Sequence, residues 1–220
     1  MRKTWMLGAT VAAAAAVTVP AAAVADGGRE ACGTRHVTIT VTNNSTTQPF
    51  SPGAIVTHAL RSVNLWDVGA FASDHLRQIA ESGKNAPMLN ALGLLRGVCD
   101  VAPLTGASGE GPILPGESAT FTLDAGGPFN RISLATMLVQ TNDGFTGLDG
   151  ERIRPATPHS VAYDAGTELN TEDPADLVLT GTGHTDEGGL VTVHPGDTPG
   201  VGVDLPWAEP VASYTIEIGA

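Results

Sequence analysis

The sequence predicts an all-β protein with one or two short helices, folded as an antiparallel β-sandwich. Short segments alternate β-branched or aromatic residues with polar ones, and turns rich in Gly and Pro, 27 and 15 of the 220 residues, separate them. This turn content excludes a long-helix or coiled-coil protein. The hydrophobic share of 42% excludes a wholly disordered chain and is ample for an ordinary core.

Residues 1–25 are predicted to be a secretory signal peptide. Two basic residues near the start precede the apolar run 5–19, and Ala23-Val24-Ala25 matches the small-residue pattern of a cleavage site. An uncleaved membrane anchor is the alternative, but a run this rich in Ala is more typical of a signal peptide. Residues 26–220 are then predicted to form a single secreted domain, in which no segment is apolar enough to span a bilayer.

The charge balance narrows the classes of partner. The chain carries 11 Lys and Arg against 23 Asp and Glu, a formal net charge of -12. Binding of a phosphate backbone depends on clustered basic side chains, so a nucleic-acid partner is not expected.

The two cysteines are expected to form a disulfide between Cys32 and Cys99. An even number of cysteines in an exported chain favours pairing in an oxidising compartment. Two buried free thiols are the alternative. A catalytic cysteine has little support, because no His or Lys lies near either one in the sequence.

Seven segments are predicted to be β-strands. The first, 36–42, alternates Thr with Val and Ile, which is typical of a strand with one buried face. The run 131–139 is apolar enough for a central strand. In order along the chain, the predicted strands are 36–42, 54–58, 118–123, 131–139, 161–163, 190–194 and 211–218.

Two short helices are predicted between the second and third of these strands. Ser73 is a typical N-cap, and Leu76, Ile79 and Ala80 share one helical face before a Ser-Gly pair ends the segment. A second helix is predicted over 87–95, also with an apolar side. We interpret both apolar faces as core packing, with the helices closing one side or one end of the sandwich.

Two acidic stretches, 141–150 and 163–170, each follow a predicted strand. Loops at the same end of a sandwich can surround one hard cation with carboxylate and carbonyl oxygens. The candidate calcium ligands are Asp143, Asp164 and Glu168. Neither stretch contains the D-x-[DN]-x-[DN]-G run of an EF-hand. The alternative interpretation is a β-turn followed by a helix cap or Asx-turn, without metal.

Seven sequence blocks, spread in order over nearly all of residues 26–220, carry a family resemblance. They are Phe50-Ser51-Pro52, Val56-Thr57-His58, Leu65-Trp66-Asp67-Val68-Gly69, Leu114-Pro115-Gly116-Glu117-Ser118, Thr141-Asn142-Asp143-Gly144-Phe145-Thr146-Gly147-Leu148-Asp149, Tyr163-Asp164-Ala165-Gly166-Thr167-Glu168 and Gly183-His184-Thr185. In this order they resemble the spondin N-terminal domain, the module of F-spondin, mindin and many bacterial secreted proteins.

The resemblance implies a C2-like antiparallel β-sandwich that is extracellular, lacks catalytic activity, serves adhesion and recognition, and binds one calcium ion through loop carboxylates. By position, the implied ligands are Asp143, in the family's Ser-Pro-Asp-Trp pattern, and Asp164 and Glu168, in its Asp-Ala-Gly-Thr-Asp pattern. Gly144 stands where the animal proteins have Trp, which removes an aromatic side chain from the loop. Glu168 replaces Asp, which keeps the charge and lengthens its reach by one methylene.

Three histidines support a competing hypothesis. His58, His184 and His194, with Asp186 or Glu187, would suit a zinc or copper site of a metal-dependent extracellular hydrolase or oxidase. Their spacing fits no zinc signature, so the simpler interpretation is that each histidine donates a hydrogen bond to a neighbouring loop. The G-x-S-x-G motif of a serine hydrolase is also missing from the sequence.

The sequence thus predicts a secreted, calcium-binding, non-catalytic module for adhesion or ligand recognition, with the metal-dependent enzyme as the alternative. The expected partner is an extracellular protein, a glycan or a cell-envelope component. Which of these it is does not follow from the sequence, because recognition surfaces of sandwiches lie on variable loops.

Overall fold

The computed structural model describes residues 32, 35–171, 173–177, 183–196 and 205–219. The predicted signal peptide, 1–25, lies outside the described residues. None of the described helices combines the length and the apolar character needed to cross a lipid bilayer.

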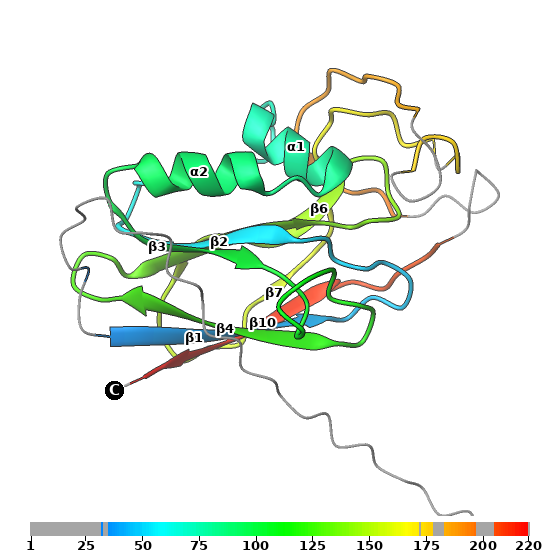
Figure 1. Ribbon diagram of the computed structural model, residues 1–220. Helices are drawn as coiled ribbons and strands as arrows, with labels where there is room; N and C mark the ends of the chain where they lie inside the picture. The colour runs from blue at the N-terminus through cyan, green and yellow to red at the C-terminus, as the bar shows by residue number, and fades with distance from the viewer. Residues whose placement is uncertain (1–31, 33–34, 172, 178–182, 197–204, 220) are drawn as a thin grey trace, which may run out of the picture.

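Two antiparallel sheets face each other and confirm the predicted all-β sandwich (Figure 1). The four-stranded sheet has the order β4-β1-β10-β7, with β1 at Arg35–Asn43, β4 at Ser118–Ala125, β7 at His159–Ser160 and β10 at Ala212–Ile218. The six-stranded sheet has the order β3-β2-β5-β6-β8-β9, with β2 at Gly53–His58, β3 at Val98–Leu104, β5 at Arg131–Met137, β6 at Gly144–Arg152, β8 at Tyr163–Asp164 and β9 at Thr192–Val193.

Strand β1 shows how a period-two pattern separates the two faces of the four-stranded sheet. Val37, Ile39 and Val41 are fully buried on its inner face. Thr side chains alternate with them on the outer face, where Thr40 Oγ1 lies 2.9 Å from Thr120 Oγ1 of β4. Such cross-strand pairs stabilise a sheet by fractions of a kcal/mol each, roughly 0.2–1. The outer face is therefore hydroxyl-rich, and the inner face forms one side of the core between the two sheets.

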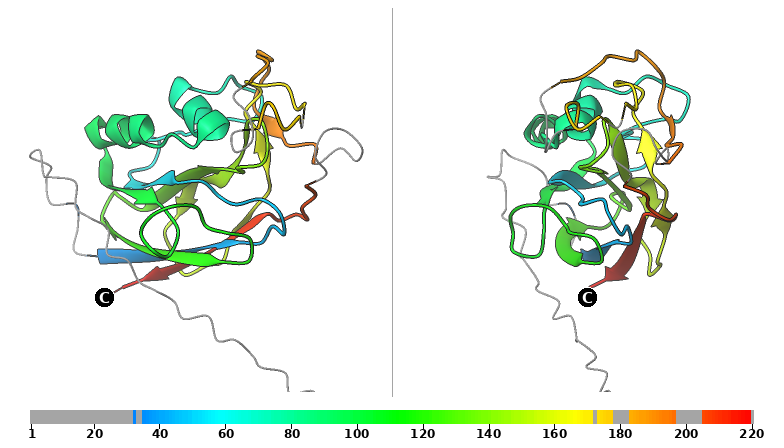
Figure 2. Two further views of the ribbon diagram at one scale, coloured as in Figure 1. Left: turned by 45° about the vertical axis from the view of Figure 1, so that its right-hand side comes forward. Right: turned by 90° about the vertical axis from the view of Figure 1, so that its right-hand side faces the viewer.

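Two short helices cover the outer face of the six-stranded sheet (Figures 1 and 2). α1 spans Asp74–Ser82 and α2 spans Ala86–Leu94, close to the predicted ranges. Ser73 caps α1 by accepting a hydrogen bond from the Leu76 backbone N–H at 3.2 Å, as its sequence predicts. Because of this cover, β2 is buried on both faces along its whole length.

The molecule has two apolar cores, one on each side of the six-stranded sheet. The core between the sheets includes the fully buried Ile39, Leu134 and Tyr214. The other core packs Leu76 and Ile79 of α1 and side chains of α2 against the outer face of the sheet. These helical faces are core packing, as predicted.

The expectation of a loop over 141–150 is wrong beyond residue 143, because β6 begins at Gly144 and pairs with β5 and β8. The glycines that favour a turn in the sequence are required here by close backbone packing. A Cβ atom on Gly147 would collide with the carbonyl group of Leu134 in β5. The first residues of the acidic segment 141–150 therefore lead directly into β6, an interior strand of the sheet.

Strand β3 is a further departure from the sequence prediction, which placed no separate strand over 98–104. Pro103 interrupts the apolar pattern, and the structure tolerates it because β3 lies at the edge of the six-stranded sheet. The predicted strands 161–163 and 190–194 are reduced to the two-residue strands β8 and β9.

The predicted disulfide between Cys32 and Cys99 is confirmed. The two sulfur atoms are 2.09 Å apart, and the bond joins positions 67 residues apart in the sequence. It attaches the segment that precedes β1 to β3, and so links the two sheets at one end.

Loss of the disulfide should reduce stability substantially. In the loop-closure model, a crosslink over this length stabilises the fold by about 4 kcal/mol, since it restricts the unfolded chain. We expect the C32S/C99A double variant to unfold at a clearly lower urea concentration than the oxidised wild type. Reduced wild type is the control and should match the variant. An unchanged midpoint would show that the crosslink contributes little.

Candidate functional site

The sheet itself brings the two acidic stretches together. Gly144, the first residue of β6, pairs with Asp164, the last residue of β8. The backbone N–H of Ala165 donates to the carbonyl of Asp143 at 3.2 Å. Asp143 and Asp164 therefore lie next to each other at one end of the six-stranded sheet, beside α1, where the loop before β6 meets the loop after β8 (Figure 1).

Asp143 holds the turn that follows Asp164. Its Oδ2 atom accepts hydrogen bonds from the Thr167 backbone N–H at 2.6 Å, the Thr167 hydroxyl at 3.1 Å and the Glu168 backbone N–H at 3.0 Å. Its Oδ1 atom is buried and has no hydrogen-bond partner, although the Asp143 side chain is 0% exposed. A buried polar atom without a partner is rare in native proteins and marks a place where another group is needed.

The turn after Asp164 is shaped by its own carboxylate and by a glycine. Asp164 Oδ1 accepts from the Gly166 backbone N–H at 2.6 Å, and its Oδ2 accepts from the Asn170 side-chain amide at 2.5 Å. Gly166 has φ of 68°, and its Cα lies against the backbone of 189–190 with no room for a Cβ. Glycine is therefore required at this position.

Glu168 completes a group of three buried carboxylates. Glu168 is 6% exposed, and its backbone forms an isolated antiparallel β-bridge with Asp186 on the neighbouring loop. Burial, followed by the negative charges of Glu81 and Asp143, raises the pKa of Glu168 to about 7. Burial and the charge of Asp164 raise the pKa of Asp143 to about 6.

In the part of the chain that the structure describes, these three carboxylates form no ion pair. The ion pairs among the described residues are His36–Asp124, Arg77–Asp74, Arg77–Glu81 and His184–Asp186, and none includes Asp143, Asp164 or Glu168. Hydrogen bonds to backbone and amide groups satisfy part of the cluster. The remaining negative charge is uncompensated by side chains in the described part of the chain.

A cation bound here would meet oxygen ligands of mixed type. Within the described residues, no three His, Cys, Asp or Glu side chains are placed to hold a metal ion by themselves. The candidate donors are instead Asp143 Oδ1, the neighbouring carboxylates and backbone carbonyls of the two loops. Calcium accepts such combinations, because it takes six to eight oxygen ligands in flexible geometry.

The three candidate histidines have separate environments. His58 lies in the sheet interior at the end of β2, with 1% exposure. His184 is on an exposed loop, 4.0 Å from the Asp186 carboxylate. The His194 ring packs edge-on against Trp207, with ring centroids 5.1 Å apart.

His58 belongs to a polar network that sequence reasoning missed. Its Nε2 atom lies 2.9 Å from the Ser133 hydroxyl, which is 3.1 Å from Asp149 Oδ1. Nδ1 lies 2.8 Å from the carbonyl of Ala59. Asp149 Oδ1 also accepts from the Leu65 backbone N–H at 3.0 Å, so the network connects three strands to the loop before α1.

The network has a structural role. Ser133 is fully buried, which leaves its hydroxyl no access to a substrate, and burial lowers the pKa of His58. No local motif reveals the network, because its members lie on three strands and meet only through the register of the sheet.

The raised pKa values give the metal-free protein a defined pH dependence. The Asp143 carboxyl releases its proton near pH 4 in the unfolded chain but near pH 6 in the fold, so its contribution to stability falls as the pH rises through this window. Asp143→Asn should remove this loss. Metal-free wild type should therefore be less stable than the variant above about pH 6, by roughly 3 kcal/mol at most.

Urea unfolding of both proteins at about pH 5 and about pH 7.5 measures the effect. The difference between the two proteins should grow with pH in favour of the variant. Glu217→Gln, on the exposed outer face of β10, is the matched control and should show no such trend. A difference that is independent of pH would contradict the assignment of the raised pKa to Asp143.

Comparisons with known proteins leave the family unassigned. No protein-family model matches the chain, and no curated protein is significantly similar to it. The resemblance to the spondin N-terminal domain therefore depends on the seven sequence blocks alone.

Proposed function

We propose that the protein is a calcium-binding, non-catalytic recognition module that acts in adhesion outside the cell. The observation that carries this proposal is the buried Asp143 Oδ1 atom, which has no hydrogen-bond partner; the Asp143 carboxylate is near that of Asp164 and forms no ion pair with a described basic side chain. The predicted leader and the disulfide support an oxidising compartment.

The electrostatics of the cluster support a bound cation. Burying a carboxylate without compensation is unfavourable, and like charges nearby increase the penalty. Asp143, Asp164 and Glu168 are at most 6% exposed. At neutral pH their mutual repulsion opposes the contact between the loop before β6 and the loop after β8. A bound divalent ion would supply the missing positive charge at this point.

The chemistry of the donors favours calcium over other common ions. Carboxylate and carbonyl oxygens are hard ligands, whereas zinc and copper prefer the nitrogen and sulfur atoms of His and Cys. Magnesium demands a near-ideal octahedral shell and keeps several waters. Asp143 Oδ1 would be a direct ligand, and the carboxylates of Asp164 and Glu168 are the nearest further candidates.

The loops that the cluster connects would form the surface that recognises a partner. Asp143 already holds the Thr167–Glu168 turn, and the Glu168 backbone pairs with that of Asp186 in an isolated β-bridge. These loops expose apolar side chains, among them Leu169 at 44% and Leu190 at 41%. Neutralising the carboxylates would hold these loops in one arrangement and so preserve a contact surface for an extracellular partner.

Calcium should raise the thermal stability of the protein. For a dissociation constant of about 10⁻⁴–10⁻³ M, as in extracellular modules, about 10 mM calcium should add roughly 1.4–2.7 kcal/mol. The melting temperature should then rise by several degrees, and less with magnesium. Asp143→Asn should abolish the rise, whereas the matched Glu217→Gln variant should keep it.

Two outcomes would contradict the calcium site. One is a melting temperature that calcium leaves unchanged in the wild type at about pH 7.5, where the carboxylates are charged. The other is a calcium effect that persists in Asp143→Asn, since the ion would then bind elsewhere.

Calcium should also control the recognition step. We expect purified glycans or cell-envelope preparations to retain the wild-type protein in calcium and to release it in chelator. Asp143→Asn should fail to bind in either condition, with Glu217→Gln again as control. If both variants were retained without calcium, recognition would not depend on the metal site, and this part of the proposal would be wrong.

A further inference from the structure

A second polar site lies at the opposite end of the sandwich. Strand β6 begins at Gly144, next to the acidic cluster, and ends at Arg152. Its nine residues span about 30 Å at the rise of an extended strand. At this far end the start of β1 and the end of β10 meet the turn between β4 and β5, and a pocket opens between the two sheets.

We propose that this pocket binds the carboxylate of a small ligand that carries an apolar or aromatic body. The site is separate from the acidic cluster and does not depend on calcium. Its evidence is a guanidinium group placed over an apolar cavity, with no acidic side chain among the described residues that line it.

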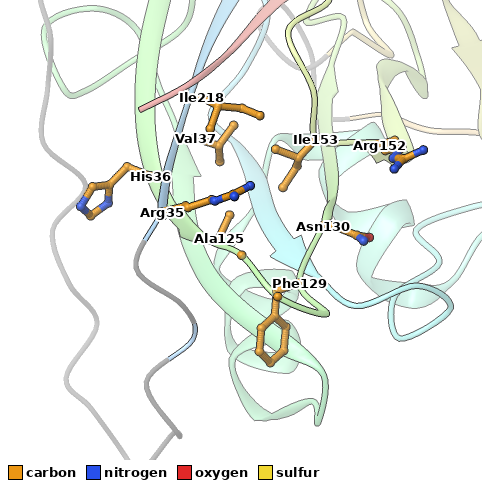
Figure 3. Close-up of a pocket in the computed structure, with 11 residues that line it drawn as sticks. Arg35, His36, Val37, Ala125, Phe129, Asn130, Arg152, Ile153 and Ile218 are labelled. Atoms are coloured by element: carbon orange, nitrogen blue, oxygen red, sulfur yellow. The ribbon is translucent and has the colours of Figure 1, made fainter. Parts of the chain in front are cut away.

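The cavity has a polar wall and an apolar floor. Its volume is about 210 Å³, and Val37, Ile153 and Ile218 line its apolar side. Figure 3 shows the Arg35 side chain extending into the pocket toward Ile153, while the ring of His36 turns away. His36 is engaged outside the pocket, where its Nδ1 atom lies 2.9 Å from the Asp124 carboxylate.

The pocket concentrates positive charge in an otherwise acidic chain. Arg35 comes from β1 and Arg152 from β6, so each sheet contributes one guanidinium to the lining. Arg131 lies directly opposite Arg152 in the β5–β6 ladder, an arrangement of like charges that is unfavourable by itself. None of the ion pairs formed by the described residues includes these three arginines. An anion in the pocket would compensate Arg35 and Arg152, the two arginines that line it.

Size and chemistry together define the ligand class. A cavity of about 150 Å³ is enough to hold a benzene ring, so this pocket accommodates a ring with one attached group. A guanidinium binds a carboxylate through two parallel hydrogen bonds, and the apolar floor favours a hydrocarbon body over a fully hydrated ion. Benzoate has both features and is a suitable probe.

A titration followed by ¹⁵N NMR tests the site. Benzoate should shift the amide signals of Gly126 and Gly127, which line the pocket, in a saturable manner. Benzamide has the ring without the charge and should bind more weakly, as should inorganic sulfate, which has the charge without the ring. The titration should give the same result in calcium and in chelator, which separates this site from the proposed calcium function.

The variants identify the residue responsible. Arg35→Gln should weaken benzoate binding at least about tenfold, the expected effect of losing a charge-assisted pair. Arg96→Gln, an exposed arginine at the end of α2, makes the same change in net charge and should bind as wild type. Ile218→Trp, at a partly exposed lining position, should block the pocket and abolish the shifts.

Three results would overturn the proposal. They are equal benzoate affinity in Arg35→Gln and wild type, sulfate binding as tight as benzoate binding, and unchanged shifts in Ile218→Trp. The second result would mark a site for inorganic anions only.

Discussion

The buried carboxylate of Asp143 is the constraint on which the site depends. One oxygen accepts three hydrogen bonds from the turn at Thr167 and Glu168 and thereby connects the loop before β6 to the loop after β8. The other oxygen is buried without a partner, and the negative charge of Asp164 lies near the carboxyl group. The same carboxylate therefore holds the loops together and brings a negative charge that no ion pair among the described residues neutralises. This is the physical reason to expect a cation there.

The sandwich keeps the two polar ends of the molecule apart. The six-stranded sheet is covered by helices on one face and by the other sheet on the opposite face, so an apolar core lies on each side of it. Apart from the His58–Ser133–Asp149 network, the two polar sites lie at the ends of β6, with carboxylates where it begins and arginines where it ends. Because the strand between them is extended and belongs to the sheet, the separation of the two sites is set by the fold and not by flexible loops.

Sequence reasoning worked best where structure follows from local pattern. The period of two in β1 and the Ser73 cap of α1 were sufficient to predict both elements. Strand β6 could not be predicted, because its glycines resemble turn residues until the close approach of β5 is known. The sequence was sufficient to predict that Asp143 lies near the loop after β8. It did not reveal that the Oδ1 atom of Asp143 lacks a partner, nor that His58 belongs to a polar network. Both features depend on the register of the sheet, which no local pattern specifies.

A crystal structure of the protein grown with calcium tests the central claim most directly. The account predicts an ion within about 2.3–2.6 Å of Asp143 Oδ1, with further oxygen ligands from the loop before β6 and the loop after β8. An Oδ1 atom that instead accepts a hydrogen bond from a protein group or a water, with no ion beside it at saturating calcium, would contradict the account.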